Sequence, residues 1–157
     1  MQNPGYIVGI DPGKRGAIAF IKTDFSEAKV FPMPQLEDAF ISLLYSYKDD
    51  VILVAIEKQQ AFPKQGISST FKLGLHYGKL LGIIKALFLP LEEIPPKRWQ
   101  KFMLGNGKKK RKQSKLLSLK KAKDLFPKLA KEIGKHDGKS DALLIAEFAR
   151  RTILLKD

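Results

Sequence analysis

The sequence near the N-terminus reads Tyr6-Ile7-Val8-Gly9-Ile10-Asp11-Pro12-Gly13. Its apolar run predicts a buried β-strand, and the Pro-Gly pair predicts a turn that ends this strand. Asp11 therefore stands at the carboxyl end of a strand, where side chains of α/β sheets point into the functional crevice. Two interpretations remain open at this point: Asp11 is a functional carboxylate, or it only begins the turn.

A second apolar run repeats this arrangement. Residues Val51 to Ile56 are aliphatic and mostly β-branched, which is typical of a central strand buried on both faces. The run ends at Glu57. A carboxylate beside so buried a strand is costly unless it is paired or bound to a metal ion. Glu57 is therefore a candidate metal ligand, with an ion pair to Lys58 as the alternative.

The rest of the chain predicts one α/β domain, a mixed sheet with helices packed on it. Tight connections between the first three strands imply an antiparallel meander. No internal repeat or second domain is visible, so we expect a single domain over residues 1–157. The expected strands cover residues 6–10, 16–21, 28–31, 51–56 and 91–94. The expected helices cover residues 36–47, 68–88, 97–104, 114–126 and 141–155, with Ser114 as a helix cap, residues 105–113 as a loop and residues 128–138 as a linker.

The charge of the chain indicates a nucleic-acid partner. It carries 29 Lys and Arg residues against 16 Asp and Glu residues, a formal net charge of +13. Lysine and arginine side chains set against phosphates release condensed counterions, which favours binding to nucleic acid. A generally basic, solvated surface is the alternative. Cysteine is absent, which excludes disulfides, thiolate metal sites and cysteine nucleophiles.

A cytoplasmic location is expected, in the nucleoid or in a phage-infected cell. No apolar run reaches the roughly 18 residues of a membrane span. Residues Met1 to Tyr6 lack the basic and apolar segments of a signal peptide. These features favour an intracellular protein.

A third group of carboxylates lies in the segment His136-Asp137-Gly138-Lys139-Ser140-Asp141-Ala142-Leu143-Leu144. Asp141 is expected to open the last helix, where an aspartate is often only a cap that complements the helix dipole. Asp137 lies four residues earlier. This spacing places both carboxylates on one side of the helix if the helix begins early enough.

The four carboxylates together indicate more than each does alone. Acidic side chains at element ends in a basic chain suit two divalent cations, because Mg²⁺ prefers oxygen ligands and is often held by few carboxylates and phosphate oxygens. Two such ions about 4 Å apart can stabilise both oxygens in phosphodiester hydrolysis. Competing sites are not supported: the sequence has no Walker loop and no Gly-x-Ser-x-Gly, and two histidines cannot form a multi-histidine zinc site.

These motifs, in this order and spacing, resemble the RuvC-type Holliday-junction resolvases of the RNase H-like superfamily. The resemblance covers nearly the whole chain, and the segment His136 to Asp141 looks closest to phage-like and related bacterial branches. It implies an RNase H-like fold with a mixed five-stranded sheet and helices on both faces. The residues that carry it are Gly9 to Gly13, Ala55 to Glu57, Phe71 to Gly74, Gly78, Gly82, Pro95 to Gly107, Lys115 and Ser140 to Leu143.

The resemblance also implies an activity and a site. The family consists of homodimers that bind a four-way DNA junction and nick two opposing strands symmetrically, with two Mg²⁺ ions for which Mn²⁺ can substitute. Asp11, Glu57 and Asp141 match its metal-binding carboxylates. The fourth ligand usually lies three residues before the last aspartate, and that position is Gly138 here. We choose Asp137 as the fourth ligand, with His136 as an outside candidate.

Further residues are expected to contact DNA. Lys115 resembles a basic residue near the scissile phosphate, where a cation would stabilise developing charge. Phe62 could stack on an unpaired base at the junction centre, or could simply pack its own loop. Gly74, Gly78 and Gly82 could let a partner helix approach, or could pack against the sheet. The remaining candidates for phosphate contacts are Lys101, Lys108, Lys109, Lys110, Arg111 and Lys112.

The expected function is that of a Mg²⁺-dependent crossover junction endodeoxyribonuclease. Two alternatives stay open. One is an RNase H-like nuclease that acts on other branched DNA, flaps or RNA–DNA hybrids. The other is a non-catalytic, basic DNA-binding module, which the carboxylates disfavour because acids in a phosphate-binding groove repel DNA unless metal is present.

Overall fold

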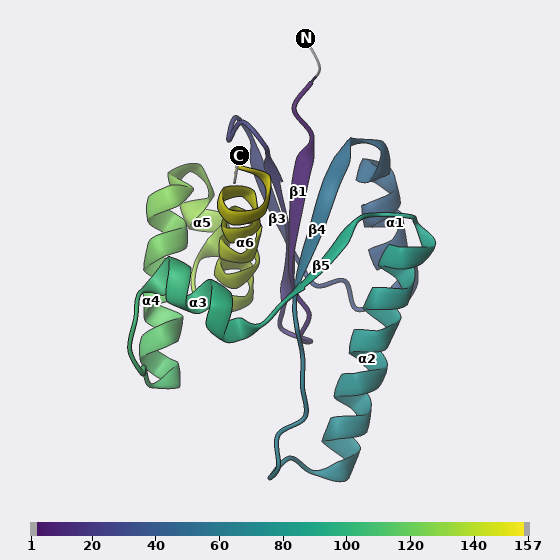
Figure 1. Cartoon of the computed structure of the whole chain (residues 1–157), viewed down its shortest axis with the longest axis vertical. Coiled ribbons are helices and arrows are strands. Elements are labelled where there is room, and N and C mark those ends of the chain that lie inside the picture. The colour runs from purple at the N-terminus through teal and green to yellow at the C-terminus, as the bar shows by residue number, and fades with distance from the viewer. Residues whose placement is uncertain (1–2, 156–157) are drawn as a thin grey trace.

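A five-stranded mixed sheet forms the centre of the computed structural model, which describes residues 3–155 (Figure 1). The strand order is β3-β2-β1-β4-β5. Strand β1 pairs antiparallel with β2 and parallel with β4; β2–β3 is antiparallel and β4–β5 is parallel. The strands are β1 (Tyr6–Asp11), β2 (Ala17–Lys22), β3 (Ala28–Pro32), β4 (Val51–Glu57) and β5 (Leu91–Ile94). The expected antiparallel meander and mixed sheet are confirmed.

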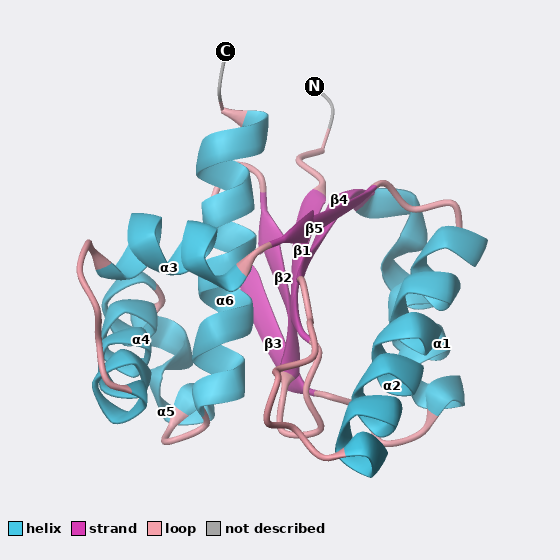
Figure 2. Ribbon diagram, turned by 60° about the horizontal axis from the view of Figure 1, so that its bottom comes forward, coloured by secondary structure: helices cyan, strands magenta, loops and turns pink. Residues whose placement is uncertain are grey.

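Helices cover both faces of this sheet, as expected (Figure 2). Helices α1 (Glu37–Tyr47) and α2 (Ile67–Ala86) lie on one face. The other face carries α3 (Pro96–Leu104), α4 (Arg111–Leu125), α5 (Ala130–Ile133) and α6 (Asp137–Ala149). Short 3₁₀ segments span Lys48–Asp50 and Pro127–Leu129, and a π-helical turn spans Arg150–Leu154. Within residues 3–155, no helix has both the length and the apolar character needed to cross a membrane.

Alternation along the strands divides the core into two clusters. Ile7 packs in the cluster beneath α6, whereas Val8 and Ile10 pack beneath α1 and α2. Successive side chains of a strand point to opposite faces. Asp11 therefore shares the α6 face with Ile7 and Gly9, the alternate residues of the same strand.

Gly9 allows α6 to lie directly on β1. A Cβ at Gly9 would collide with the backbone of α6 at Ala142 and Ala146. Both of these residues are fully buried. The short side chains of α6 and the missing side chain at Gly9 therefore bring the helix backbone close to the central strand.

Helix ends differ from the sequence-based expectation in two places. Helix α4 begins at Arg111, so Ser114 is an interior residue and not the cap; lysine, arginine and glutamine are good helix formers, and the helix extends through them. Residues 128–138 are not a linker, because they form a 3₁₀ segment, α5 and the start of α6. Helix α6 begins at Asp137 and not at Asp141, since the imidazole of His136 accepts the Lys139 N–H as an N-cap.

Candidate active site

Asp11 and Glu57 end neighbouring parallel strands and face the same helix. The β1–β4 register pairs Gly9 with Ala55 and Ile10 with Ile56, so the next residues of the two strands are Asp11 and Glu57. Ala55, two residues before Glu57, packs beneath α6. Strand alternation thus points both carboxylates toward α6, at the carboxyl edge of the sheet.

Asp137 and Asp141 approach this edge from α6. Because α6 begins at Asp137, the two carboxylates lie one turn apart on the same side of the helix. The N-cap of α6 is His136, and Asp141 lies in the second turn. The interpretation of Asp141 as a helix cap is therefore wrong.

A cleft of about 240 Å³ brings three of the four carboxylates together. Glu57 does not line this cleft directly, but it lies close enough to Asp11 and Asp141 to raise the pKa of both. The lining residues are Asp11, Trp99, Gln100, Leu104, Arg111, Ser114, Lys115, Asp137 and Asp141.

Burial and mutual repulsion make these acids harder to ionise. Burial, and then the charge of Glu57, raise the pKa of Asp11 to about 7. Burial raises the pKa of Asp141 to about 8; a hydrogen bond from Ser118 opposes this shift, and the charges of Asp11 and Glu57 add to it. Burial also raises the pKa of Glu57, against hydrogen bonds from Trp99 and Gln59. Like charges close together in a buried place disfavour ionisation unless a cation compensates.

The polar partners of the carboxylates are residues that sequence reasoning missed. Trp99 Nε1 donates to Glu57 Oε2 at 2.7 Å, and Ser118 Oγ donates to Asp141 Oδ1 at 2.5 Å. Both Trp99 and Ser118 are buried. The available signals were a lone tryptophan in a basic segment and a serine four residues before Ala122 on the buried face of α4.

The structure supports the alternative role of Asp11 in the turn, but not the alternative ion pair of Glu57 with Lys58. Among residues 3–155, Glu57 forms no ion pair with Lys58, and its partners are Trp99 and Gln59. Asp11 does take part in the turn, since the Gly13 N–H donates to its Oδ1 at 3.4 Å. That long bond uses one oxygen only, so the turn role and a ligand role are compatible.

Gly138 stands where the resemblance places the fourth ligand, and it has no room for a side chain. A Cβ there would collide with the backbone carbonyl of Arg15 and lie 3.0 Å from Gly16 Cα. The turn between β1 and β2 thus packs directly on the first turn of α6. His136, the outside candidate, already accepts a hydrogen bond at Nδ1 from the Lys139 N–H at 3.1 Å.

Lys115 reaches the cleft from α4. Its ammonium lies 3.6 Å from Asp137 Oδ2, and both side chains are nearly half exposed. A contact of this kind in solvent contributes about 0–1 kcal/mol to stability. It places a mobile positive charge at the mouth of an acidic cleft.

A larger basic groove of about 620 Å³ adjoins the cleft and shares Gln100, Leu104 and Ser114 with it. Of the expected phosphate contacts, Lys101, Lys108 and Lys109 line this groove, together with Lys97. Arg111 lines the acidic cleft instead. Lys110 and Lys112 are exposed beside the start of α4, and neither lines a cavity described here.

Lys109 differs from its neighbours because it turns back on its own loop. Its ammonium donates to the carbonyls of Gly105 at 2.8 Å and of Asn106 at 3.2 Å. Gly105 and Gly107 have φ values of 95° and 100°, which glycine adopts readily. Lys109 thus holds the α3–α4 loop in shape, whereas Lys101 and Lys108 stay exposed.

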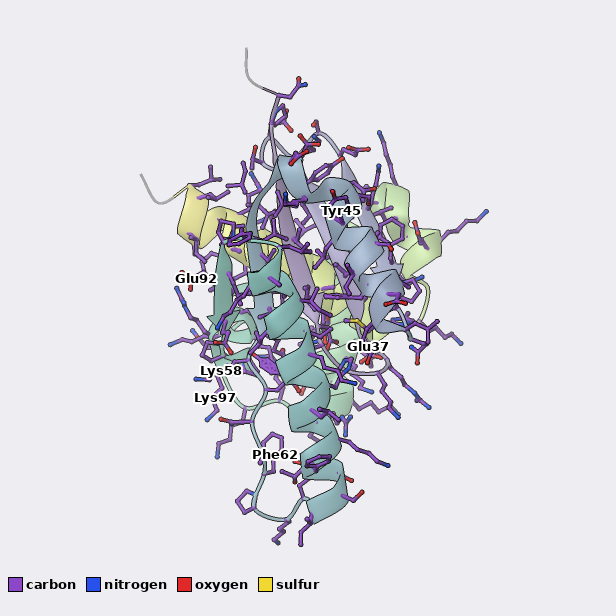
Figure 3. All side chains as sticks on the ribbon, turned by 90° about the vertical axis from the view of Figure 1, so that its right-hand side faces the viewer. Glu37, Tyr45, Lys58, Phe62, Glu92 and Lys97 are labelled. Carbon is purple, nitrogen blue, oxygen red and sulfur yellow. The ribbon has the colours of Figure 1, made fainter. Side chains whose placement is uncertain are left out.

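Phe62 and three glycines of α2 were each expected either to contact a partner or to pack within the chain. Phe62 is 64% exposed in the loop before α2 (Figure 3), so it does not pack its own loop. A Cβ at Gly74, Gly78 or Gly82 would meet nothing within 4 Å, so these glycines do not pack against the sheet.

The donor set fits hard divalent cations. It consists of carboxylates whose burial is costly without a positive charge, and carboxylate oxygens are the ligands that Mg²⁺ prefers. Among the described residues, no three acidic or histidine side chains are close enough together to enclose one ion by themselves. Phosphate oxygens and water commonly complete the shell of Mg²⁺, so few protein ligands per ion are expected.

Comparison with known proteins shows which proteins the chain resembles. No protein-family model matches the chain. The chain is 29% identical over 162 residues to the crossover junction endodeoxyribonuclease RuvC of Rhizobium johnstonii, which covers 93% of this chain and 89% of that protein. Its fold matches Thermus thermophilus RuvC with a TM-score of 0.62 at 18% identity, over 94% of this chain and 96% of the other.

A second solved structure, T. thermophilus RuvC in complex with a Holliday junction substrate, gives a TM-score of 0.61 at 16% identity over the same shares of both chains. These relatives come from bacteria, and none of them bears on the phage-like branch suggested by residues 136–141. Similarity in sequence and in fold extends along nearly the whole chain, which resembles RuvC in sequence and shares its fold.

Proposed function

We propose that this protein is a metal-dependent endonuclease that resolves four-way DNA junctions. The carrying observation is the convergence of Asp11, Glu57, Asp137 and Asp141 beside one cleft, with a basic groove adjoining it. The name of its Rhizobium relative and the junction complex of its Thermus relative support the same substrate.

The carboxylates would hold two Mg²⁺ ions, or Mn²⁺ in their place. When bound, such ions supply an activated water and stabilise the charge on the attacking and leaving oxygens. Asp11 and Asp141 are the central ligands of the proposal, because each is partly buried and is repelled by the other acids. Glu57 and Asp137 complete the set from β4 and from the first turn of α6.

The basic groove would bind the phosphate backbone and lead it to the cleft. Lys101 and Lys108 are exposed along this groove, and Lys115 lies where the groove and the acidic cleft meet. Contacts to phosphates position DNA without reading its sequence. The ion pair between Lys115 and Asp137 is solvent-exposed and weak, so the Lys115 ammonium can break it when DNA binds. The ammonium could then stabilise the charge on the scissile phosphate.

Branch recognition would use Phe62. The loop that carries Phe62 directly follows Glu57 in the sequence, and Glu57 is one of the carboxylates beside the cleft. Its exposure of 64% leaves the ring free to stack. Stacking of a base on an aromatic side chain is worth about 1–3 kcal/mol, so Phe62→Ala is expected to weaken junction binding roughly tenfold or more.

A homodimer is part of this proposal, and α2 offers the surface for it. Ile67, Phe71 and Leu75 recur every four residues on α2 and are 91%, 69% and 49% exposed. Gly78 and Gly82 continue this stripe with open space around them. Apolar side chains followed by glycines let a second helix approach closely, and a symmetric pair of sites suits the two nicks of a junction.

The decisive experiment compares cleavage by the wild type and Asp11→Asn, with and without Mg²⁺. The substrates are a four-way junction, a flap, a linear duplex and an RNA–DNA hybrid. We expect Mg²⁺-dependent nicking of the junction by the wild type, and junction binding without nicking by Asp11→Asn. Faster cleavage of the flap or the hybrid would assign another substrate, and no cleavage of any substrate in Mg²⁺ or Mn²⁺ would leave a DNA-binding module.

A further inference from the structure

Two buried side chains donate hydrogen bonds to carboxylates of the candidate site. Trp99 belongs to α3 and donates to Glu57 Oε2, while Ser118 belongs to α4 and donates to Asp141 Oδ1. Both donors are about 1% exposed. Each therefore occupies one oxygen of a carboxylate.

Both side chains act here as donors to the carboxylates. The indole N–H of Trp99 only donates, and Ser118 uses its hydroxyl proton on Asp141. Within residues 3–155, Asp141 Oδ2 has no hydrogen-bond partner, and Glu57 Oε1 has only the long contact from Gln59 at 3.3 Å. The donors thus fix the rotation of each carboxylate and leave its second oxygen available.

Ser118 is itself held in place. Ser140 Oγ lies 2.8 Å from Ser118 Oγ, and Ser140 Oγ donates to the carbonyl of Asp137 at 2.9 Å. This chain of contacts links α4 to the first two turns of α6, where Asp137 and Asp141 lie. A shift of α4 along α6 would therefore move the carboxylate of Asp141.

We propose that Trp99 and Ser118 are positioning residues that orient Glu57 and Asp141 for cation binding, an inference that rests on the proposed metal-dependent function. The same two helices carry basic residues beside the site: Lys101 lines the groove from α3, and Lys115 lines the cleft from α4. DNA that binds these helices could therefore change the orientation of the Glu57 and Asp141 carboxylates.

The test uses Trp99→Phe and Ser118→Ala, which remove the donors and keep most of the packing. Mn²⁺ binding to the DNA-free protein is followed by electron paramagnetic resonance, which reports free Mn²⁺. Loss of a residue that orients a metal ligand typically weakens metal affinity by roughly 10–100-fold, and we expect a loss in this range for each variant. Junction affinity measured without metal should stay within twofold of the wild type.

Two controls separate orientation from a general loss of packing. Met103→Leu changes a buried thioether of α3 that cannot donate to a carboxylate, and Ser46→Ala makes the serine substitution on α1, across the sheet. Both should bind Mn²⁺ like the wild type. For Trp99→Phe and Ser118→Ala, single-turnover cleavage should recover as Mn²⁺ is raised, because the defect lies in cation binding; a merely loosened fold would not recover.

The outcomes are distinguishable from a failure of the proposed function. If the wild type neither binds Mn²⁺ nor cleaves a junction, the function itself is wrong. If the wild type binds and cleaves, and both variants bind Mn²⁺ within twofold of it, Trp99 and Ser118 do not position the ligands and the inference is overturned.

Discussion

Lys115 Nζ lies 3.6 Å from Asp137 Oδ2, so a cation of the protein itself touches the outermost carboxylate of the cleft. Both side chains are 40–45% exposed. Solvent weakens such a pair, and DNA or a divalent ion can replace either partner at little cost. The pair can therefore open when substrate and metal enter.

Lys115→Ala tests what this ammonium does. We expect the free energy of unfolding to change by less than about 1 kcal/mol, because an exposed ion pair contributes little. Single-turnover cleavage of a junction should fall at least about tenfold, since a positive charge beside the scissile phosphate is lost. Junction affinity, measured by gel shift in Ca²⁺, should fall much less. An unchanged cleavage rate would remove Lys115 from the site.

Asp11→Asn should change how stability depends on pH in the metal-free protein. The pKa of Asp11 is raised to about 7 in the folded state, above the ordinary value of 3.8 for an aspartate. Stability from such a group is complete below its unfolded pKa and is lost as the pH rises through its folded pKa. Asn cannot ionise, so the variant should exceed the wild type in stability at pH 8 by on the order of 4 kcal/mol, and lie within about 1 kcal/mol of it at pH 4.

Urea denaturation in EDTA at pH 4, 6 and 8 measures this difference. Asp141 keeps its own raised pKa in the variant, so some loss of stability toward pH 8 should remain. A difference between Asp11→Asn and the wild type that is the same at all three pH values would contradict the buried, repelled state of Asp11.

Lys101 and Lys109 should separate DNA contact from loop structure. Lys101→Ala should weaken junction binding and reduce the slope of log affinity against log salt by about 1, because one phosphate contact is lost. Lys109 donates to the carbonyls of Gly105 and Asn106, so Lys109→Ala should loosen the α3–α4 loop. Hydrogen exchange of residues 105–110 should rise in Lys109→Ala only.

Equal salt slopes and equal exchange for the two variants would contradict this division. Lys108, which is exposed on the same loop, provides a further comparison. Lys108→Ala should behave like Lys101→Ala, because its side chain makes no contact with the loop carbonyls among the hydrogen bonds of the described residues.

Phe71→Glu should prevent the proposed dimer. Phe71 is 69% exposed in the middle of the apolar stripe of α2, and a charge there would be buried in a helix pair. Sedimentation should give a dimer for the wild type and a monomer for the variant. Tyr45→Glu, at an equally exposed aromatic residue of α1 (Figure 3), should leave the dimer intact. A monomeric wild type would refute the dimer.

Much of the fold follows from short-range patterns in the sequence. Apolar runs of five or six residues ending in Asp11 and Glu57 predicted two strands whose ends carry acids, and both strands are present. On α2, the apolar residues Tyr77, Leu80 and Ile84 recur at helical spacing, and all three are buried. Such patterns are readable because side-chain periodicity reports which face of an element is buried.

The first residues of the helices were harder to predict, because capping depends on which side-chain atom reaches a free backbone N–H and not on composition. Ser114 looked like a cap but lies inside α4, while His136 caps α6 through an imidazole nitrogen. The early start of α6 has a functional consequence, since it places Asp137 and Asp141 on one side of the helix.

The sequence by itself determined which acids end the strands, that the chain is strongly basic, and which family it resembles. Only the tertiary structure decided that Trp99 and Ser118 hold Glu57 and Asp141, and that Gly138 has no space for a ligand beside Arg15. The reason is physical: these relations join residues 23 to 123 positions apart, and such contacts depend on how α3, α4 and α6 pack on the sheet. Local periodicity carries no information on that packing.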